Sequence, residues 1–324
     1  MDNIKAENLI SEIGQFWEIV NCTLCGSESW IAHLTRGDLN LFLEGEFSLV
    51  RCSECGLVYL NPRPTRSQVS LLYPIYYDQF NFNIHKRRFW ASLDHNYGLL
   101  KRCKSVLRYK DQGRLLDVGC ATGDFLDAMR KRPGWEVYGV EISESASEYA
   151  RRYLGLAVKT GDLEDVDYPE HYFDVVTLWH VLEHLYDPLN ALKKIHLWLK
   201  PDGILIFNTP NLDSLDARLF GPYWIGYDLP RHLQIFSPNT LRILTDKSGF
   251  RIVDMRCLYG SYAAAASSIR FWIRAKKRNA KGLKLVERIL FSLPLRILAS
   301  PCFFLMDRLR LSSALTVTCV KAGD

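Results

Sequence analysis

Four cysteines near the start of the chain have the spacing of a metal site. Two C-x2-C pairs, each followed by glycine, are separated by 26 residues; they are Cys22, Cys25, Cys52 and Cys55. Four thiolates suit a tetrahedral zinc ion, and a site closed by four protein ligands is structural rather than catalytic. The spacing therefore predicts a zinc ribbon over residues 1–60. The alternative is four independent reduced thiols.

A second chemical signal is the stretch LLDVGCATGDF at residues 115–125. An apolar run reaches Asp117 and then breaks into small residues at Gly119, Ala121 and Gly123. Dinucleotide sites use G-x-G-x-x-G/A and phosphate loops use G-x-x-x-x-G-K-[ST], and the chain has neither pattern. A carboxylate before the turn would repel a phosphate but attract an amine. We therefore expect a ligand with an amino-acid end, its ammonium near Asp117.

Two further acids complete the predicted ligand. Glu141 ends the next apolar run, where a carboxylate can accept both hydroxyls of a ribose. Asp162, in TGDLED, can accept from the exocyclic amine of adenine while the Leu163 amide donates to a ring nitrogen. A ligand with an amino acid, a ribose and an adenine but no phosphate is S-adenosylmethionine.

The surrounding pattern predicts the fold that positions these residues. Continuous apolar runs alternate with amphipathic helical segments, which is typical of a parallel sheet covered on both faces. We expect an α/β, doubly wound (Rossmann-like), seven-stranded, mostly parallel sheet, with the ligand at the carboxyl ends of its strands. The expected strands are 114–119, 136–142, 157–162, 173–179, 203–210, 251–259 and 314–322.

The chain divides into five expected units. A zinc ribbon (1–60) is followed by a helical connector (61–112) with a long amphipathic helix over 86–110. The cofactor-binding domain covers 113–261. A basic amphipathic helical insertion (262–310) precedes the final strand of the sheet (311–324).

Several motifs together carry a family resemblance. LLDVGCATGDF, GVEIS, TGDLEDV and FDVVTLWHVLEHLYDP resemble a class I S-adenosylmethionine-dependent methyltransferase. LPRHLQIFSPNTLRILTDKSGF resembles the downstream part of a branch that often carries an N-terminal zinc ribbon, with sugar C-methyltransferase-like and ubiquinone-biosynthesis-like members. The middle glycine of the family turn is Ala121 here. The resemblance implies these cofactor residues: Asp117, Gly119, Cys120, Ala121, Gly123, Glu141, Ile142, Asp162, Leu163, Trp179 and His180.

Methyl transfer often requires a base that takes a proton from the acceptor, and two histidines are candidates. His184 lies in WHVLEHLYDP, where with Glu183 it is expected to begin a helix, and it could equally pin that helix start. His232 lies in the aromatic-rich stretch YWIGYDLPRHLQIF, which we expect to form a substrate lid. The alternative for His232 is a role in holding this loop. Arg231 could bind an anionic group of the acceptor or pair with Asp228.

Charge is concentrated in one segment. The chain carries a net charge of +5, whereas residues 262–310 alone hold 11 Lys and Arg against 2 Asp and Glu. The rest is mildly acidic, and the cations of this segment alternate with large aliphatic side chains, which disfavours nucleic acid as a partner. Pro294 and Pro301 interrupt its most apolar part, so we expect no membrane-spanning helix. Two alternatives stay open: a segment on an anionic membrane surface, or a helical subdomain with a solvated basic face.

These observations lead to one functional expectation. The start of the chain, MDNIKAENLISEIG, is charged, so we expect no signal peptide and a cytoplasmic protein, peripheral to the inner membrane face if residues 262–310 bind lipid. We expect methyl transfer from S-adenosylmethionine to a small-molecule or carrier-linked acceptor (lipid- or nucleotide-linked), such as a sugar in polysaccharide or secondary metabolism. The alternatives are an RNA methyltransferase and a non-catalytic cofactor-binding scaffold.

Overall fold

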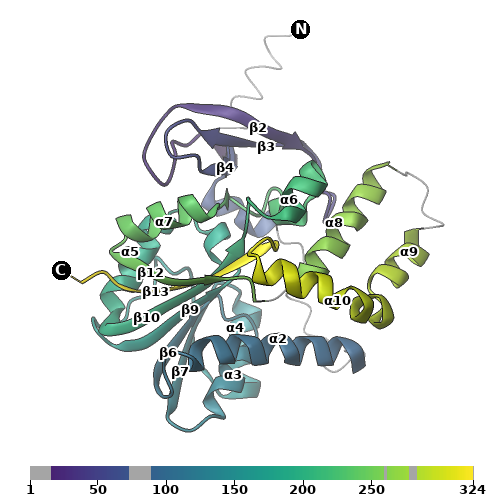
Figure 1. Ribbon diagram of the computed structural model, residues 1–324. Helices are drawn as coiled ribbons and strands as arrows, with labels where there is room; N and C mark the ends of the chain where they lie inside the picture. Colours follow the sequence, from purple (N-terminus) through teal and green to yellow (C-terminus); the bar gives the residue numbers. More distant parts are fainter. Residues whose placement is uncertain (1–15, 73–88, 259–260, 277–282, 324) are drawn as a thin grey trace.

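The core of the protein is a seven-stranded sheet. A computed structural model describes residues 16–72, 89–258, 261–276 and 283–323 (Figure 1). The strand order is β12-β13-β10-β9-β6-β7-β8, and only β13 runs antiparallel to its neighbours. This confirms the predicted doubly wound, mostly parallel α/β fold. The strands are β6 (Gly113–Val118), β7 (Trp135–Glu141), β8 (Ala157–Thr160), β9 (Phe173–Trp179), β10 (Leu199–Pro210), β12 (Phe250–Arg256) and β13 (Ala314–Lys321).

Helices cover both faces of this sheet, which explains the unbroken apolar runs of its strands. The adjacent residues Leu115 and Leu116 enter opposite core clusters, as do Val175 and Val176. One cluster packs under α2 (Phe89–Leu107), α3 (Asp124–Arg130) and α4 (Glu144–Leu154). The other packs under α5 (Pro188–Trp198) and α7 (Pro238–Lys247). Strand ends are thereby fixed from both sides.

The helix expected to begin at Glu183 and His184 starts later. These residues form a short 3-10 turn, η4 (Leu182–His184), and α5 begins at Pro188. Asp187 accepts a hydrogen bond from the Asn190 amide and caps α5, with proline at the first helical position. That detail of the sequence prediction was wrong, and it leaves Glu183 and His184 in the loop that follows β9.

The N-terminal cysteine-containing segment forms a second, antiparallel sheet. Its strands are β2 (Trp30–Arg36), β3 (Phe47–Cys52) and β4 (Val58–Leu60), and β11 (Gln234–Ile235) adds the fourth strand. A separate pair joins β1 (Trp17–Glu18) to β5 (Arg63–Pro64), ahead of η1 (Arg66–Leu72). Because β11 comes from the loop after β10, the N-terminal segment and that loop share one sheet.

A buried ion cluster reinforces this junction. The Arg231 guanidinium donates to both Asp38 oxygens, each at 2.8 Å, and to both Asp228 oxygens at 2.7 and 3.0 Å. All three side chains are buried. Burial alone would raise the pKa of Asp228, but the bonds and charge of Arg231 outweigh it and hold that pKa below its usual value. Arg231 therefore pairs internally and does not face an acceptor, which decides between the two roles weighed from the sequence.

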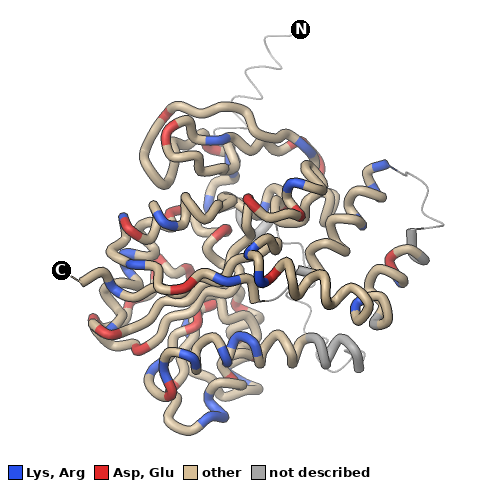
Figure 2. The backbone as a smooth tube through the Cα atoms, viewed as in Figure 1, with Lys and Arg blue, Asp and Glu red and all other residues tan. Residues whose placement is uncertain are grey.

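Among the residues that the structure describes, three helices lie between the last two strands, as expected for the basic insertion. They are α8 (Ser261–Lys276), α9 (Leu283–Leu290) and α10 (Leu293–Arg308). They project to one side of the sheet, next to α6 (Leu215–Phe220), and carry scattered cations (Figures 1 and 2). Among the residues with described structure, no helix is long and apolar enough to cross a membrane. The five unit boundaries drawn from the sequence stay predictions.

The ion cluster generates a stability prediction. Asp38→Asn removes one of the two charges that face buried Arg231, and we expect it to lower the free energy of unfolding by about 3 kcal/mol. Asp202→Asn is the matched control, because Asp202 pairs with Lys110 at an exposed position (2.6 Å) and should cost less than about 1 kcal/mol. Urea denaturation measures both. Equal effects of the two substitutions would contradict a special role for the buried cluster.

Candidate functional site

The predicted cofactor residues meet at one edge of the main sheet. Asp117 lies near the end of β6, Glu141 ends β7 and Trp179 ends β9, while Asp162 follows β8. These four strands are neighbours and parallel, so their carboxyl ends share one edge. The turn between β6 and α3, residues 119–123, lies at the same edge. The structure thus brings together residues that are up to 62 positions apart in the chain.

The turn after β6 depends on its glycines. Gly119 and Gly123 have positive φ angles of 69° and 83°, and so does Ala121, at 48°. A Cβ atom on Gly119 would lie 2.4 Å from Val181, and one on Gly123 would lie 2.4 Å from Leu156. Ala121 accepts this left-handed conformation at a cost of roughly 1 kcal/mol relative to glycine. The backbone of the turn therefore accommodates alanine in place of the family glycine, at a small cost in strain.

Cys120 contributes to this turn only through its backbone. Its side chain is buried in the core cluster, and its Sγ atom would lie 2.6 Å from a Cβ placed on Gly139. Its amide donates to the Val140 carbonyl, which ties the turn to β7. The thiol therefore has a packing role, and burial raises the pKa of this thiol well above its usual value.

Glu141 has the geometry of a ribose acceptor. Its two oxygens accept hydrogen bonds from the amides of Ala121 (2.8 Å) and Ser143 (2.9 Å), and the Ile142 amide also lowers the pKa of this carboxyl group. Two carboxylate oxygens offer about four lone pairs, so acceptor capacity remains for a ligand hydroxyl. Burial raises the pKa of Glu141, and the backbone amides oppose this. Beside it, Ile142 is 59% exposed and offers an apolar surface for a flat ring. These two neighbours suit a nucleoside, with the sugar on Glu141 and the base over Ile142.

Asp117 is a buried acid that a bound cation would ionise. It is 3% exposed and accepts from the Thr177 hydroxyl at 2.6 Å. Burial raises its pKa to about 7, while that hydrogen bond and the charge of Arg102 act in the opposite direction. A cationic amine placed next to this carboxyl group would stabilise its charged form. The residue thus fits the ammonium end of S-adenosylmethionine.

The remaining cofactor candidates line the same edge. Asp162 accepts from the Glu164 amide at 3.2 Å and is partly exposed, with Arg66 3.9 Å away, whereas the Leu163 side chain is buried. Trp179 is buried and packs edge-on against Phe125. His180 is partly exposed and shares a hydrogen bond with Glu183 at 3.1 Å. Asp162 and His180 are thus the more accessible of these groups.

Next to the cofactor edge, Glu183, His184 and His232 form a compact cluster. One nitrogen of each histidine and one Glu183 oxygen all lie within 4.8 Å of one another. The histidine rings meet edge to face with centroids 4.8 Å apart. The η4 turn carries Glu183 and His184, and its neighbour Val181 is the residue against which Gly119 packs. The cluster therefore adjoins the turn that would hold the cofactor.

Hydrogen bonds fix the tautomers in this cluster. Nδ1–H of His232 donates to the Gly226 carbonyl (2.8 Å), and Nδ1–H of His184 donates to the Arg231 carbonyl (2.9 Å). A carbonyl only accepts, so in the neutral rings Nε2 carries the lone pair. One Glu183 oxygen bonds His180, and the other, Oε2, is buried without a hydrogen-bond partner among the described residues.

Electrostatics separates the roles of these groups. Burial and the neighbouring His232 lower the pKa of His184 to about 4, against the opposing charge of Glu183. Burial would raise the pKa of Glu183, but the hydrogen bond from His180 and the charges of the three histidines bring it to about 2. Glu183 is therefore an anion at neutral pH, and His184 is a neutral hydrogen-bonding group and a weak base.

The loop before His232 is packed into the protein and does not form an open lid. Trp224 is fully buried, with its indole N–H donating to Ser313 (3.2 Å), and Tyr227 packs edge-on against it. His33 of β2 shares a hydrogen bond with the Tyr227 hydroxyl (3.1 Å). Of Tyr223, Trp224 and Tyr227 in the expected lid, only Tyr223 is partly exposed. Trp224 and Tyr227 form the core of this loop and hold it against the N-terminal sheet.

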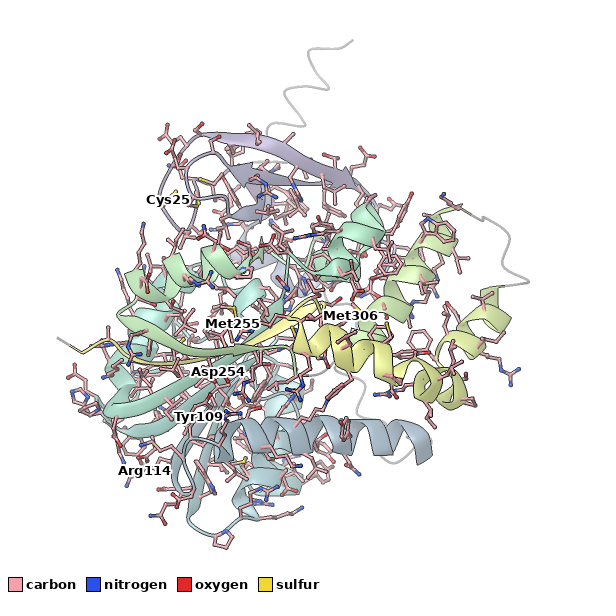
Figure 3. All side chains as sticks on the ribbon, viewed as in Figure 1. Cys25, Tyr109, Arg114, Asp254, Met255 and Met306 are labelled. Atoms are coloured by element: carbon pink, nitrogen blue, oxygen red, sulfur yellow. The ribbon has the colours of Figure 1, made fainter. Side chains whose placement is uncertain are left out.

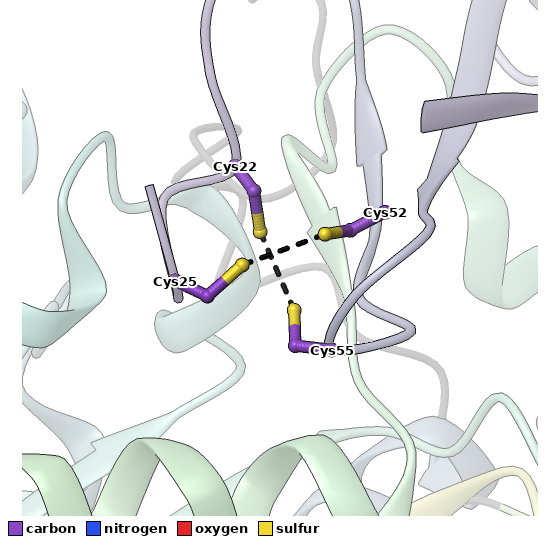
Figure 4. Close-up of side chains that lie close together, drawn as sticks. All are labelled: Cys22, Cys25, Cys52 and Cys55. Carbon is purple, nitrogen blue, oxygen red and sulfur yellow. Dashed lines mark hydrogen bonds between the residues drawn. The ribbon is translucent and has the colours of Figure 1, made fainter. Parts of the chain in front are cut away.

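The four cysteines predicted to bind zinc converge in the N-terminal sheet (Figure 4). Cys22 Sγ lies 3.4 Å from Cys55 Sγ, and Cys25 Sγ lies 3.5 Å from Cys52 Sγ. A tetrahedral zinc with roughly 2.3 Å bonds separates its sulfur ligands by slightly more, so the cluster is nearly preformed. Gly26 and Gly56 have positive φ angles and turn the chain after each pair. The four-thiolate set fits a structural zinc ion.

A cavity of about 210 Å³ lies elsewhere, between α2 and the β12 edge of the sheet. Tyr109 and Asp254 meet there, with the Tyr109 hydroxyl donating to Asp254 at 3.0 Å (Figure 3). Its other lining residues include Lys101, Lys104 and Arg108. The predicted cofactor residues come from β6–β9, so this cavity is distinct from their edge.

Comparison with known proteins agrees with this geometry. The family described as "Methyltransferase domain" matches residues 87–255, more than half of the chain. The chain belongs to this family. This membership confirms the family that the sequence motifs predicted, the class I S-adenosylmethionine-dependent methyltransferases. The matched region contains every predicted cofactor residue and both candidate bases, but neither the cysteine cluster nor α8–α10.

Similar methyltransferases are known from several organisms. The ubiquinone biosynthesis O-methyltransferase of Actinobacillus pleuropneumoniae serotype 5b is 34% identical over 176 residues, 49% of this chain and 73% of that protein. The Coxiella burnetii enzyme of that name is 30% identical over 153 residues. The match covers 44% of the present chain and 64% of the Coxiella enzyme.

Solved structures resemble its fold. A Thermotoga maritima methyltransferase, named as a possible histamine N-methyltransferase, is 26% identical with a TM-score of 0.42, covering 51% of this chain and 75% of that one. A methyltransferase from Archaeoglobus fulgidus is 19% identical with a TM-score of 0.44, covering 72% and 100%.

Several residues of the candidate site were not singled out from the sequence. Asp38 and Asn40 hold the loop before His232, through Arg231 and Asp228. Arg102 of α2 lies over the Trp179 ring (5.5 Å) and acts on the charge of Asp117. These contacts join distant segments, so no local spacing indicates them. Only the Gly-Asp pair at 37–38 gives a weak signal, that of a turn.

The cysteine cluster predicts a bound metal. We expect the purified methyltransferase to contain about one zinc ion per chain by mass spectrometry of its metals, and Cys52→Ser to lose it together with thermal stability. Cys302→Ser is the control, since Cys302 is exposed and outside the cluster, and it should retain zinc. A zinc-free native protein, or equal loss in both variants, would show that the thiols are independent.

Asp117 predicts a pH-dependent affinity. A ligand ammonium favours the carboxylate, and the pKa of about 7 in the free protein means that Asp117 is largely protonated at pH 6. S-adenosylmethionine should therefore bind about tenfold more tightly at pH 7.5 than at pH 6, with proton uptake by the buffer, in isothermal titration calorimetry. Asp117→Asn should bind weakly and lose this pH dependence. A wild-type affinity independent of pH would argue against an ammonium at Asp117.

Proposed function

We propose that this methyltransferase methylates a small-molecule acceptor held beside His232, and that His232 is the base. The observation that supports it most is the hydrogen bond from His232 Nδ1–H to the Gly226 carbonyl, which leaves Nε2 as the proton-accepting atom. His184 is a weaker candidate because its pKa is about 4. It supports the cluster by fixing the loop through the Arg231 carbonyl.

Glu183 complements this base. When His232 takes a proton, the imidazolium forms close to a carboxylate that is already ionised. Glu183 Oε2 has no partner among the described side chains, so it can also accept a hydrogen bond from the acceptor or from the ring.

The reaction is a displacement at carbon. When bound, S-adenosylmethionine supplies a methyl group already activated by its sulfonium. Asp117 and Glu141 position the cofactor ends, while His232 Nε2 removes the proton of the attacking group. The acceptor gains the bond to the methyl carbon as the carbon–sulfur bond breaks, and its electron pair remains on sulfur. Alignment and deprotonation are thus what the chain contributes.

The acceptor class is inferred from the site and from its relatives. The similar enzymes named for ubiquinone biosynthesis carry out O-methylation, as their name states. A histidine base suits a phenol or another acidic hydroxyl, and it equally suits an activated carbon of a sugar. We therefore propose a small-molecule or carrier-linked acceptor, with nucleotide-linked sugars and phenols as the first two classes to test.

The decisive experiment is turnover with radiolabelled S-adenosylmethionine. The acceptor panel contains nucleotide-linked sugars, phenols and bulk transfer RNA. His232→Asn retains a donor for the Gly226 carbonyl but has no basic nitrogen. We expect it to lower kcat by about 10²–10⁴-fold without changing cofactor affinity.

The control is His171→Asn, an exposed histidine that bonds the Leu199 carbonyl and should keep full activity. Unchanged kcat in His232→Asn would remove His232 as the base. Methylation of RNA alone, with salt-sensitive binding, would favour an RNA methyltransferase. Cofactor binding without turnover on any acceptor would favour a scaffold.

A further inference from the structure

Helix α10 presents an apolar face to solvent. Ile297, Leu298, Phe304 and Leu305 are 61%, 79%, 63% and 58% exposed, and Pro301 lies exposed between them. Their spacing places them on one side of the helix. Ile289 of α9 and Phe291 after it are about half exposed and enlarge the apolar surface. Single exposed apolar residues are common, but a stripe along a helix marks an interaction surface.

Exposed arginines lie near this apolar face, whereas the two acidic residues of the segment are less accessible. Arg288, Arg308 and Arg310 are exposed. The only two acids of residues 262–310 are less accessible: Glu287 pairs with Arg274 at 2.6 Å, and Asp307 accepts from Ser312 at 2.5 Å. The described part of this segment therefore shows solvent an apolar stripe together with exposed arginines. Figure 2 shows that cations outnumber acids along these helices.

We propose that α9 and α10 dock the protein on an anionic bilayer surface, with the α10 stripe in the interfacial layer. An α-helix of 16 residues is roughly 24 Å long, enough to lie in the membrane plane. Leu, Ile and Phe supply the apolar contact, and arginines at the rim meet lipid phosphates. A protein partner would need acidic residues opposite these arginines and a surface of matching shape. An anionic lipid headgroup layer supplies the negative charge and does not need a matching shape.

Docking by this face would bring the acceptor loop to the membrane. The Tyr262 hydroxyl of α8 donates to the Leu290 carbonyl, which links α8 to α9. Ser268 of α8 accepts from the Ile225 amide at 3.0 Å, in the loop that leads to His232. A lipid-linked acceptor would then be delivered close to the site. This consequence rests on the proposed function, whereas membrane docking itself does not.

Vesicle flotation of the full chain tests the docking. The vesicles are phosphatidylcholine alone or with about 30% phosphatidylglycerol. We expect binding only to the anionic vesicles, weakening as salt is raised. The double variant Leu298→Asp/Phe304→Asp should lower the vesicle partition coefficient at least about tenfold by removing the apolar contact. Arg308→Glu/Arg310→Glu should lower it by about tenfold or more.

A matched control comes from α5. Leu197 is 52% exposed and Lys193 is also exposed, so the double variant Leu197→Asp/Lys193→Glu introduces both kinds of substitution on a helix away from the proposed surface. It should bind vesicles like the native protein. S-adenosylmethionine titration checks that every variant is folded.

Three results would overturn the proposal. These are no binding of the native chain to anionic vesicles, equal loss in the α5 control, and a native dimer in light scattering that Leu298→Asp/Phe304→Asp makes monomeric without any vesicle binding. The last would mean that a second copy covers the stripe. None of these readouts uses methyl transfer, so failure here leaves the proposed reaction untouched.

Discussion

The buried Arg231 cluster is the interaction on which the arrangement of the site depends. An arginine without access to water is stable only when carboxylates face it from close range, and here one carboxylate comes from each side of a junction. Asp38 belongs to the N-terminal segment and Asp228 to the loop after β10. Neither segment can move away without exposing an uncompensated charge. The junction therefore acts as one body, and His232, the next residue after Arg231, takes its position from it.

A second constraint joins this body to the cofactor edge. Gly119 has no side chain, so Val181 can pack directly against the turn after β6. The same short segment carries His180, Glu183 and His184, and the Glu183 carbonyl accepts from the Leu233 amide at 2.9 Å. The turn after β6 therefore contacts the η4 segment, and η4 in turn contacts the loop that carries His232. Alignment of a methyl group with an acceptor is sensitive to shifts of about 1 Å, which makes such close packing functionally meaningful.

Features that depend on local sequence patterns could be predicted from the sequence. Apolar runs and caps set the strands and helices, and the Asp117 turn and the paired cysteines are short motifs with fixed spacing. The pairing of Asp38 with Arg231 could not be predicted, because the two residues are 193 positions apart and meet only through the addition of β11 to β4. The loop that contains Trp224 and Tyr227 was expected to form a substrate lid. Both side chains are buried, and each has a polar partner: Ser313, just before β13, accepts from the indole N–H, and His33 of β2 shares a hydrogen bond with the phenol.

These contacts give the cysteine cluster an indirect connection to catalysis. The cysteines fix the ends of the N-terminal sheet, since Cys52 ends β3 and Cys55 precedes β4, and β4 pairs with β11. Asp38 lies in the β2–β3 connection of that sheet and holds Arg231, whose carbonyl accepts from His184. Each step in this series is a contact, and none places a sulfur near the cofactor edge. A metal at the cysteines would therefore act on methyl transfer through the position of His184 and His232, and chemistry at the acceptor would remain the task of the protein's own side chains.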